Sequence, residues 1–356
     1  MVTKFKLGRS LVGEGCPTYF IADIAANHDN DLDRAFMLID RCAQAGADAV
    51  KFQNFKANTI VSDHGFRSLK SFKSHQSEWK ESVYQTYDKV ALSIEWTQLL
   101  KEKCDSCGID YLTAPYDIEI LDHLRPFVCA WKLGSGDITW LELINLLSRD
   151  SKPLLIATGA STIENVRSAM SVASQNNNEI VLMQCNTNYT GSLENFKFVN
   201  LNVLNLYRKE FPSAVLGLSD HTPGHATVLG AIVLGAKVIE KHFTDDTSRP
   251  GPDHKFSMDP HTWLDMVSRA RELENSLGDG LKRIEDNELE TSVLQRRALR
   301  TSTDLLAGTI LTKDNVIPLR PCPENGLDPS QIDRILGRKL TRDLCNGELL
   351  TSADFC

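Results

Sequence analysis

Short apolar runs alternate with amphipathic stretches from residue 19 to about residue 277. Eight of the runs have the length and composition of buried β-strands: residues 19–24, 48–53, 109–114, 130–134, 153–158, 180–185, 215–219 and 238–243. The stretches between them have helical periodicity; over residues 32–45, apolar side chains recur every three or four positions. Eight strand–helix units predict a (β/α)8 TIM barrel. A doubly wound sheet is the alternative, but no Gly-x-Gly-x-x-Gly follows the first strand.

Local signals mark the ends of several predicted helices. Ser161, with Glu164 three residues later, predicts a capping box at a helix start. Gly46 and Gly235, each followed by alanine, are expected to end helices in left-handed C-caps just before the next strand. These signals place helices between the strands, as a barrel requires.

Two stretches interrupt the alternation. Residues 58–92 form a long polar excursion after the second strand, which we expect to cover the barrel mouth or to contact a partner subunit. Residues 278–296 are rich in charge and predict a linker. Residues 297–356 hold turn signals between short strand-like runs, which predicts a small β-rich domain that docks on another surface. The barrel domain then covers residues 1–277.

Composition and charge exclude several classes of protein. The net charge of −8 leaves no surplus of basic residues to neutralise phosphates, which argues against nucleic-acid and membrane partners. Residues 1–10 lack the apolar core of a signal peptide, and no apolar run approaches the ~18 residues of a membrane span. The cysteines include one Cys-x-x-Cys, Cys104 and Cys107, without the second pair that a zinc site needs. We therefore expect a cytoplasmic protein with free thiols.

Polar residues collect at the carboxyl ends of the predicted strands, where barrel enzymes place their active sites. Strand alternation puts Lys51 and Gln53 on the inner face of the second strand, with Ser219 and His221 on the seventh and His242 on the eighth. Adjacent strands lie ~4.8 Å apart, so the two imidazoles can converge on one ion. Either histidine alone would more often be structural, and it is the pair that indicates a metal. Two nitrogen ligands with open positions favour Mn(II), with Co(II) or Mg(II) as alternatives.

Two lysines near strand ends predict an anion site. Lys51 and Lys132 lie on barrel strands, and a lysine turned into a barrel needs an anion because burying it unpaired is costly. The Gly-Ser-Gly turn at residues 134–136 can offer backbone N–H groups, and Ser219 adds a hydroxyl, so we expect a cradle for phosphate and carboxylate groups. Either lysine alone could instead be a solvated surface residue.

An acidic residue ends the first predicted strand. Asp23 could act there as an acid or base on water or on an aldehyde, or it could simply accept hydrogen bonds in a loop. Asp29 and Asp31 follow it, and we expect both to cap the next helix.

Several runs resemble the sialic acid synthase family, in the family's order and along nearly the whole chain. They are ADIAANH (22–28), GADAVKFQ (46–53), KLGSGD (132–137), GLSDHT (217–222), EKHFT (240–244) and PGPDH (250–254). Residues 297–356 resemble the family's antifreeze-protein-like (SAF) domain, with GTIL (308–311) and LRP (319–321). The resemblance implies a synthase that condenses phosphoenolpyruvate with an N-acylmannosamine-like aldehyde and releases phosphate by C–O cleavage. Members are typically domain-swapped homodimers that use a divalent metal.

The resemblance also implies a role for each matching residue. The metal ligands would be His221 and His242. Asp23, from its place at a strand end, is our own candidate for acid–base assistance in the implied reaction. The residues that hold phosphoenolpyruvate would be Lys51, Gln53, Lys132, Ser135 and Ser219. The residues that contact the sugar would be Tyr189, Asp253 and, from the C-terminal domain of the other subunit, Arg320.

Some positions depart from the family's pattern. Aspartate replaces the usual glutamate at Asp23 and Asp137, and alanine replaces phosphate-contacting hydroxyl residues at Ala114 and Ala157. Residues 185–191 read CNTNYTG where the family has Cys-Thr-x-x-Tyr-Pro. These changes surround the sugar and anion sites. They indicate a different acylated sugar, such as a 2,4-diacetamido-trideoxy hexose leading to a legionaminic- or pseudaminic-type product.

Two other functions stay open. A related barrel synthase could join phosphoenolpyruvate to an aldose phosphate, but it would need a second anion site, and Arg249 after the eighth strand is the only candidate we identify. A non-catalytic carbohydrate-binding protein could also keep the barrel and the tail. The retained pair His221 and His242 counts against that second alternative.

Overall fold

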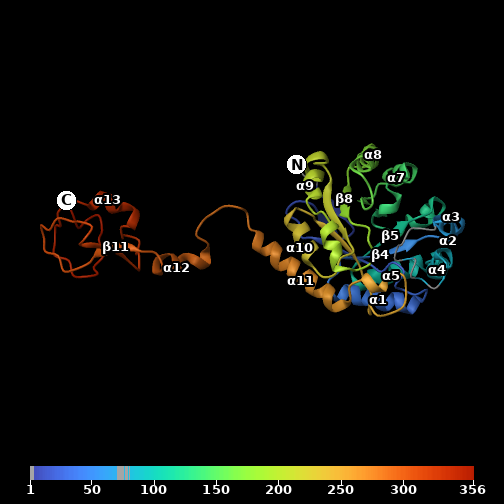
Figure 1. The fold of residues 1–356 in the computed structure, drawn as a ribbon, viewed down its shortest axis with the longest axis horizontal. Helices are drawn as coiled ribbons and strands as arrows, with labels where there is room; N and C mark the ends of the chain where they lie inside the picture. Colours follow the sequence, from blue (N-terminus) through green and yellow to red (C-terminus); the bar gives the residue numbers. More distant parts are fainter. Residues whose placement is uncertain (1–3, 70–75, 77–78, 80) are drawn as a thin grey trace. The chain divides into compact units, whose positions relative to one another are not determined.

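The computed structural model describes residues 4–69, 76, 79 and 81–356, and the chain forms two compact units, Met1–Gly278 and Asp279–Cys356 (Figure 1). Residues 1–3 lie outside the described residues. They begin the segment in which we expect no signal peptide. So does part of the predicted excursion, residues 70–75, 77, 78 and 80. Within the described part of the chain, no helix is both long and apolar enough to cross a membrane.

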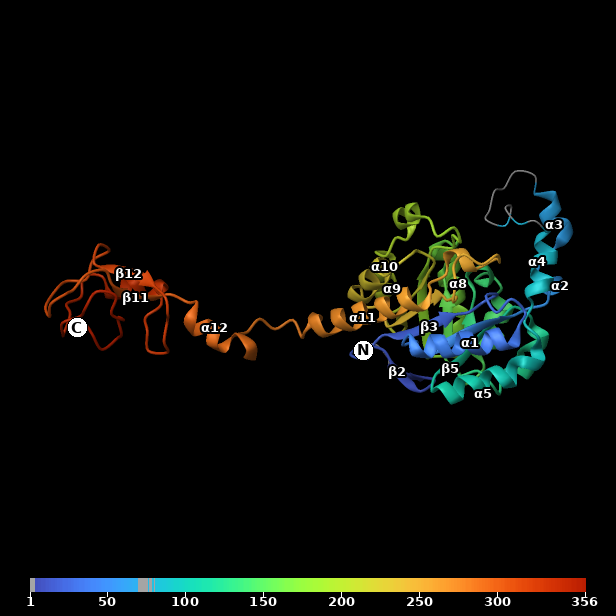
Figure 2. The same ribbon diagram turned by 90° about the horizontal axis from the view of Figure 1, so that it is seen from below.

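The first unit is built around a closed barrel of eight parallel strands, which confirms the predicted (β/α)8 fold and rules out the doubly wound sheet (Figure 2). In their order around the barrel, the strands are β10 (Val238–His242), β3 (Tyr19–Asp23), β4 (Ala49–Asn54), β5 (Asp110–Pro115), β6 (Trp131–Leu133), β7 (Leu154–Ala157), β8 (Ile180–Cys185) and β9 (Val215–Asp220). Every predicted strand is present, and its ends differ from the prediction by one residue at most.

Helices surround the barrel and bury their apolar faces against it. They are α1 (Leu32–Gln44), α5 (Thr97–Cys107), α6 (Leu121–Leu124), α7 (Leu141–Ser148), α8 (Ile163–Ala173), α9 (Val203–Glu210), α10 (Ala226–Val233) and α11 (Pro260–Leu277). In α1, the buried residues are Ala35, Leu38, Ile39 and Cys42, which recur every three or four positions as the sequence predicts.

The predicted helix ends are confirmed at two glycines and wrong at one cap. Gly46 and Gly235 follow α1 and α10 with φ angles of +85° and +88°, in the left-handed region that favours glycine. The capping box of α8 is formed by Thr162 and Asn165, one residue later than predicted. It shifts because the hydroxyl of Ser161 instead donates to a backbone carbonyl at 2.6 Å.

A short hairpin that the sequence pattern did not reveal closes the amino end of the barrel. Its strands, β1 (Phe5–Leu7) and β2 (Ser10–Val12), pair antiparallel. Phe5, Leu7 and Val12 are buried in one cluster with apolar side chains from inside the barrel, such as Tyr19 and Val238. Apolar side chains therefore fill the amino end of the barrel, and the polar cavity lies at the carboxyl end.

The excursion between β4 and α5 carries three short helices, α2 (Ala57–Ile60), α3 (Asp63–Ser68) and α4 (Val83–Val90). Ile60 and Tyr87 line the cavity at the barrel mouth. The described part of the excursion therefore lies at the mouth, which is one of the two places predicted for it. Contact with a partner subunit stays a prediction.

The second unit has an apolar core of its own. It contains α12 (Leu289–Leu294), the antiparallel pair β11 (Ala298–Thr301) and β12 (Val316–Leu319), and α13 (Ile332–Ile335). Its core residues are Leu299, Leu305, Leu311, Val316, Ile335, Leu340, Leu344 and Leu350. A small β-containing domain at the end of the chain is thereby confirmed.

Candidate active site

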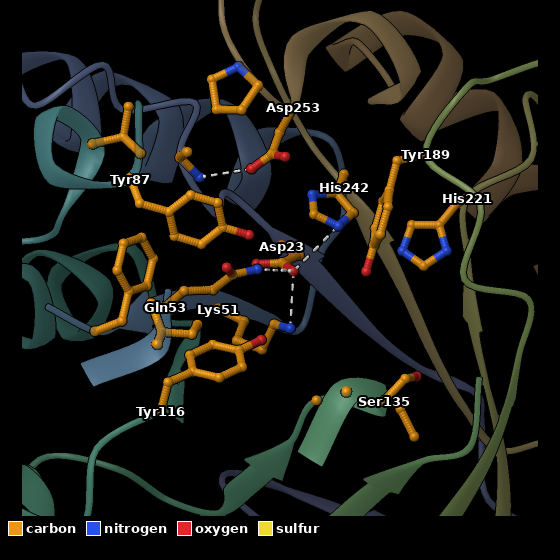
Figure 3. Close-up of a pocket in the computed structure, with 18 of the residues that line it drawn as sticks. Asp23, Lys51, Gln53, Tyr87, Tyr116, Ser135, Tyr189, His221, His242 and Asp253 are labelled. Carbon is orange, nitrogen blue, oxygen red and sulfur yellow. Dashed lines mark hydrogen bonds and ion pairs between the residues drawn. The ribbon is translucent and has the colours of Figure 1, made fainter. Parts of the chain in front are cut away.

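A cavity of about 370 Å³ opens at the carboxyl end of the barrel. Every predicted site residue except Arg320 lines it: Asp23, Lys51, Gln53, Lys132, Ser135, Tyr189, Ser219, His221, His242 and Asp253 (Figure 3). Arg320 lies in the second unit, directly after β12. Strand alternation therefore placed the inward side chains of β4, β9 and β10 correctly.

Buried charges form a network inside the barrel. Lys51 Nζ lies 2.8 Å from Asp23 Oδ2 and 3.1 Å from Glu240 Oε1. Lys132 Nζ lies 3.2 Å from the same Glu240 oxygen, and Ser219 Oγ donates to it at 3.1 Å. All five side chains are buried. The strand register explains the convergence, because Glu240 on β10 is directly opposite Ser219 on β9.

The network fixes the charge of its members. Burial alone would raise the pKa of Glu240, but Lys132 and Lys51 lower it to about 2. Burial would lower the pKa of Lys51, but the carboxylates of Asp23 and Glu240 raise it above its ordinary value. Lys132 has a lowered pKa, because burial and the nearby Lys51 outweigh its pairing with Glu240. A second anion beside Lys132 would therefore stabilise that ammonium group.

Two histidines stand together beside this network. The ring centroids of His221 and His242 lie 5.3 Å apart. Nδ1 of His221 lies 3.1 Å from the backbone oxygen of Asn186, and because that oxygen can only accept, Nδ1 donates to it. In the neutral ring, Nε2 then carries the lone pair that a metal would bind. Nδ1 of His242 is buried and has no hydrogen-bond partner among the described residues, while its Nε2 lies 3.6 Å from Asp23 Oδ2.

These residues fit a divalent transition ion. Burial lowers the pKa of His242, which favours the neutral imidazole that metals bind. Among the described residues, no group of three or more His, Cys, Asp or Glu side chains is arranged to hold an ion. An ion on His221 and His242 would therefore take its remaining ligands from substrate oxygens or water, as open catalytic sites do.

A glycine-rich turn forms the wall near Lys132. Ser135 follows β6, and its Oγ accepts a hydrogen bond from Gly159 N at 2.9 Å. A Cβ atom at Gly134 would lie 2.7 Å from the hydroxyl of Tyr116, and one at Gly159 would lie 1.8 Å from Thr187 Oγ1. A side chain at either position would force these neighbouring side chains to shift. Gly134 lines the cavity, and without a side chain its backbone could approach a bound anion closely.

The opposite side of the cavity is largely apolar and aromatic, although Gln76 and Thr86 of the excursion also line it. This apolar wall consists of Phe55, Ile60, Tyr87, Val90 and Tyr116, and the labelled Tyr87 and Tyr116 extend toward the cavity in Figure 3. The ring of Phe55 lies 5.2 Å from that of Tyr87 and 6.3 Å from that of Tyr116. The wall comes from the end of β4, the excursion and the end of β5.

Sequence reasoning did not assign several of these residues to the site. Glu240 lies on the inward register of β10, so the signal that identified His242 was sufficient to find it. Asp137, which the sequence placed near the sugar and anion sites without a role, also lines the cavity, and burial raises the pKa of its carboxyl to about 6. The place of Tyr87 in the site could not be predicted, because Tyr87 lies on α4 and strand alternation applies only to the barrel strands.

Comparison with known proteins identifies the family. The model of the NeuB family matches residues 38–282, and that of the SAF domain matches residues 296–355. The chain is 35% identical over 344 residues to the N,N'-diacetyllegionaminic acid synthase of Legionella pneumophila, covering 95% of this chain and 94% of that one. It is 30% identical over 342 residues to a pseudaminic acid synthase of Campylobacter jejuni, covering 95% and 96%.

A solved structure agrees with this result. The spore coat polysaccharide biosynthesis protein SpsE of Bacillus subtilis superposes with a TM-score of 0.66 at 29% identity, covering 99% of both chains. The resemblance of the sequence runs to sialic-acid-type synthases is thus confirmed. The chain belongs to the NeuB family and carries a C-terminal SAF domain.

Proposed function

We propose that this protein condenses phosphoenolpyruvate with an N-acylated amino-hexose aldehyde, forming a nine-carbon nonulosonic acid and releasing phosphate. The observation that carries the proposal is the convergence of Lys51, Lys132, His221 and His242 on one cavity at the carboxyl end of the barrel. Relatives named as legionaminic and pseudaminic acid synthases support it.

Phosphoenolpyruvate would bind among the lysines. Among the described residues, Glu240 is the one carboxylate that pairs with Lys132, and Lys51 shares it. An anion that binds beside Lys132 therefore gains more than it would beside a cation that is already neutralised. Ser135, Ser219 and the backbone of the Gly-Ser-Gly turn supply hydrogen-bond donors around it. Gln53, with its Nε2 3.2 Å from Asp23 Oδ2, lies beside this anion site.

The reaction makes one bond and breaks another. C3 of phosphoenolpyruvate forms the new bond with the aldehyde carbon, whose oxygen takes up a proton. Water adds to C2 and loses a proton, and the bond between C2 and the phosphate oxygen breaks, which leaves the ketone of an α-keto acid. The cavity contributes by holding both substrates in this orientation.

Residues at the ends of β3, β9 and β10 would act on the aldehyde and the water. A divalent ion held by His221 and His242, with Mn(II) favoured, would supply polarisation of the aldehyde oxygen. Asp23 is held by Lys51 and by the backbone N–H of Ala25 at 3.1 Å. Asp23, which lines the cavity, is our candidate to accept the proton that the attacking water loses.

The apolar wall bears on the choice of sugar. A 2,4-diacetamido-trideoxy hexose carries a second acetyl methyl and a deoxy methyl where N-acetylmannosamine carries hydroxyls. Each methyl group placed against Phe55, Tyr87 or a neighbour contributes about 0.8 kcal/mol. We therefore propose a diacetamido-trideoxy hexose as the substrate, a choice that the diacetylated product named for the Legionella relative supports.

A phosphate-release assay with purified protein, phosphoenolpyruvate and Mn(II), Co(II) or Mg(II) tests the proposal. We expect phosphate release with N-acylated hexosamines, and faster release with 2,4-diacetamido-trideoxy hexoses than with N-acetylmannosamine. Phosphoenolpyruvate labelled with ¹⁸O in the bridging position should pass its label to phosphate. Binding of sugars without phosphate release under any of these metals would overturn the proposal in favour of a carbohydrate-binding protein.

Sugar phosphates belong in the same panel. Within the described residues, no arginine lines the cavity, and both lysines are engaged with Glu240, which leaves little for a second phosphate. Turnover with aldose phosphates alone would favour the aldose-phosphate synthase instead.

A further inference from the structure

The loop that follows β10 is bonded to the loop that follows β3, and this contact sets the position of Asp253. The Asp253 carboxylate lines the cavity and accepts a hydrogen bond from Ala26 N at 3.1 Å (Figure 3). Ser257 Oγ donates to the backbone oxygen of Asp253 at 2.6 Å. Asn27 Nδ2 in turn donates to Ser257 Oγ at 2.9 Å. The position of Asp253 therefore depends on the contact between the loop after β3 (residues 24–31) and the loop after β10 (residues 243–259), which we call the joint.

His254, the next residue, is fully buried in this joint. Its Nε2 lies 3.0 Å from Asp29 Oδ1, and its Nδ1 lies 2.7 Å from Thr244 Oγ1. A carboxylate only accepts, so Nε2 donates to Asp29, and Nδ1 forms a second hydrogen bond with the Thr244 hydroxyl. Bonds at both nitrogens fix the plane of the imidazole and hence the backbone that carries Asp253.

Asp29 forms this contact with His254 and does not cap α1. Asp31 is the N-cap of α1, so the expectation that Asp29 shares this role is wrong. Asp29 has a φ angle of +52°, a left-handed conformation that costs a non-glycine residue free energy. Its carboxylate also accepts from Arg249 Nη2 at 2.8 Å and lies 3.1 Å from Arg34 Nε. Its three partners come from both sides of the joint.

The loop also closes tightly around the imidazole. A Cβ atom at Gly251 would lie 2.6 Å from Cδ2 and 3.1 Å from Nε2 of His254. Neither Asp29 nor His254 is among the described residues that line the cavity. They can affect the cavity through Asp253, which is next to His254 in the sequence and does line the cavity.

We propose that Asp29 and His254 are positioning residues that hold the Asp253 carboxylate where it binds the polar groups of the sugar. The inference rests on the proposed function, because it assigns the sugar to the Asp253 side of the cavity. Loss of either residue should weaken sugar binding while leaving the phosphoenolpyruvate site, which lies among the lysines, intact.

Steady-state kinetics of the full-length enzyme tests this. We expect His254→Ala to raise the sugar KM ~10-fold or more, with the phosphoenolpyruvate KM changed less than about twofold. His254→Gln, which can present an N–H near the position of Nε2, should recover part of the loss. Asp29→Asn and Gly251→Ala should give the same pattern and serve if His254→Ala does not fold. Asp31→Ala is the matched control, since it removes a helix cap from the same loop and should lower Tm without raising the sugar KM.

A double-mutant cycle distinguishes positioning of Asp253 by His254 from a general contribution of His254 to the structure of the site. In an Asp253→Asn background, His254→Ala should add less than about twofold to the sugar KM, because both changes remove the same interaction. Independent effects of the two substitutions, or a fall in kcat with a rise in both KM values, would overturn the inference.

The proposed function can fail separately. If the wild-type protein does not turn over, calorimetry of sugar binding replaces the KM comparison. Loss of sugar affinity in His254→Ala then supports the inference without the reaction. Equal affinity in the two proteins, or no sugar binding by the wild type, overturns it.

Discussion

Asp220 and Lys241 form a buried ion pair that ties β9 to β10 behind the two cavity histidines. Asp220 precedes His221 and Lys241 precedes His242, so strand alternation points the pair outward and the imidazoles inward. Asp220 also accepts from Thr227 of α10 at 2.6 Å, which confirms the outward direction. The pair thereby holds the two histidine-bearing strand ends side by side.

Removal of one partner of this pair should be costly. Lys241→Met leaves Asp220 buried without its cation, and we expect the free energy of unfolding to fall by about 3–5 kcal/mol. Urea denaturation measures the change. Asp220→Leu combined with Lys241→Met should lose less than Lys241→Met alone, because no charge is left unpaired. A double variant less stable than the single one would contradict this account.

The cavity histidines should be essential for activity but not for folding. His221→Ala and His242→Ala should each slow phosphate release by ~10³-fold or more, since polarisation of the aldehyde is worth several kcal/mol. Their circular dichroism should match the wild type, while Mn(II) binding measured by titration should be lost. His123→Ala on α6, away from the cavity, is the control. Wild-type turnover in either cavity variant, with bound metal quantified, would refute the assignment.

The apolar wall should determine sugar preference. Tyr87→Ala should lower the ratio of kcat/KM for a 2,4-diacetamido-trideoxy hexose over N-acetylmannosamine by ~10-fold, because it removes apolar contact that the first sugar uses more. Tyr84→Ala lies on the same helix, does not line the cavity, and should leave the ratio unchanged. An equal loss for both sugars would mean that Tyr87 supports the cavity without selecting between them.

Asp137 should make stability depend on pH. Burial raises its pKa in the folded protein to about 6 from an ordinary value of 3.8, so the folded state binds the proton more tightly than the unfolded chain. Above pH 6 the buried carboxylate therefore destabilises the fold, and the penalty disappears as pH falls toward 4. Asp137→Asn should stabilise the protein at pH 8 by about 1–2 kcal/mol, and by less at pH 5. A gain independent of pH, measured by urea denaturation, would exclude this cause.

Arg320 tests the predicted exchange of domains between subunits. Arg320→Ala should raise the sugar KM with little change in the phosphoenolpyruvate KM. If Arg320 serves the barrel of a partner subunit, mixing Arg320→Ala with His242→Ala should restore activity at low sugar concentration. In the mixed dimer, one intact barrel receives an intact arginine. An unchanged sugar KM, or mixtures without restored activity, would count against the exchange.

The barrel and most of the polar side chains that line its cavity could be predicted from the sequence because strand alternation has a fixed period. Lys51 and His242 follow directly from that period and from their places at carboxyl ends of strands. Tyr87 could not be found, because α4 reaches the cavity through tertiary packing of the excursion. The β1–β2 hairpin was missed because three-residue strands carry too little pattern. The cap of α8 was wrongly assigned to Ser161 because its neighbour Thr162 also carries a hydroxyl group that can cap the helix.

The hairpin at the amino end has a kinetic consequence. Since apolar side chains such as Phe5 and Leu7 seal that end, the proposed substrates and product would pass through the carboxyl end, where the described residues form the cavity. Lys51 lies deeper along β4 than Gln53, whereas Asp253 and Tyr87 belong to loops at the rim. A sugar seated at the rim would obstruct access to the lysines. If the proposed function holds, phosphoenolpyruvate would have to bind first, and we expect compulsory-order kinetics.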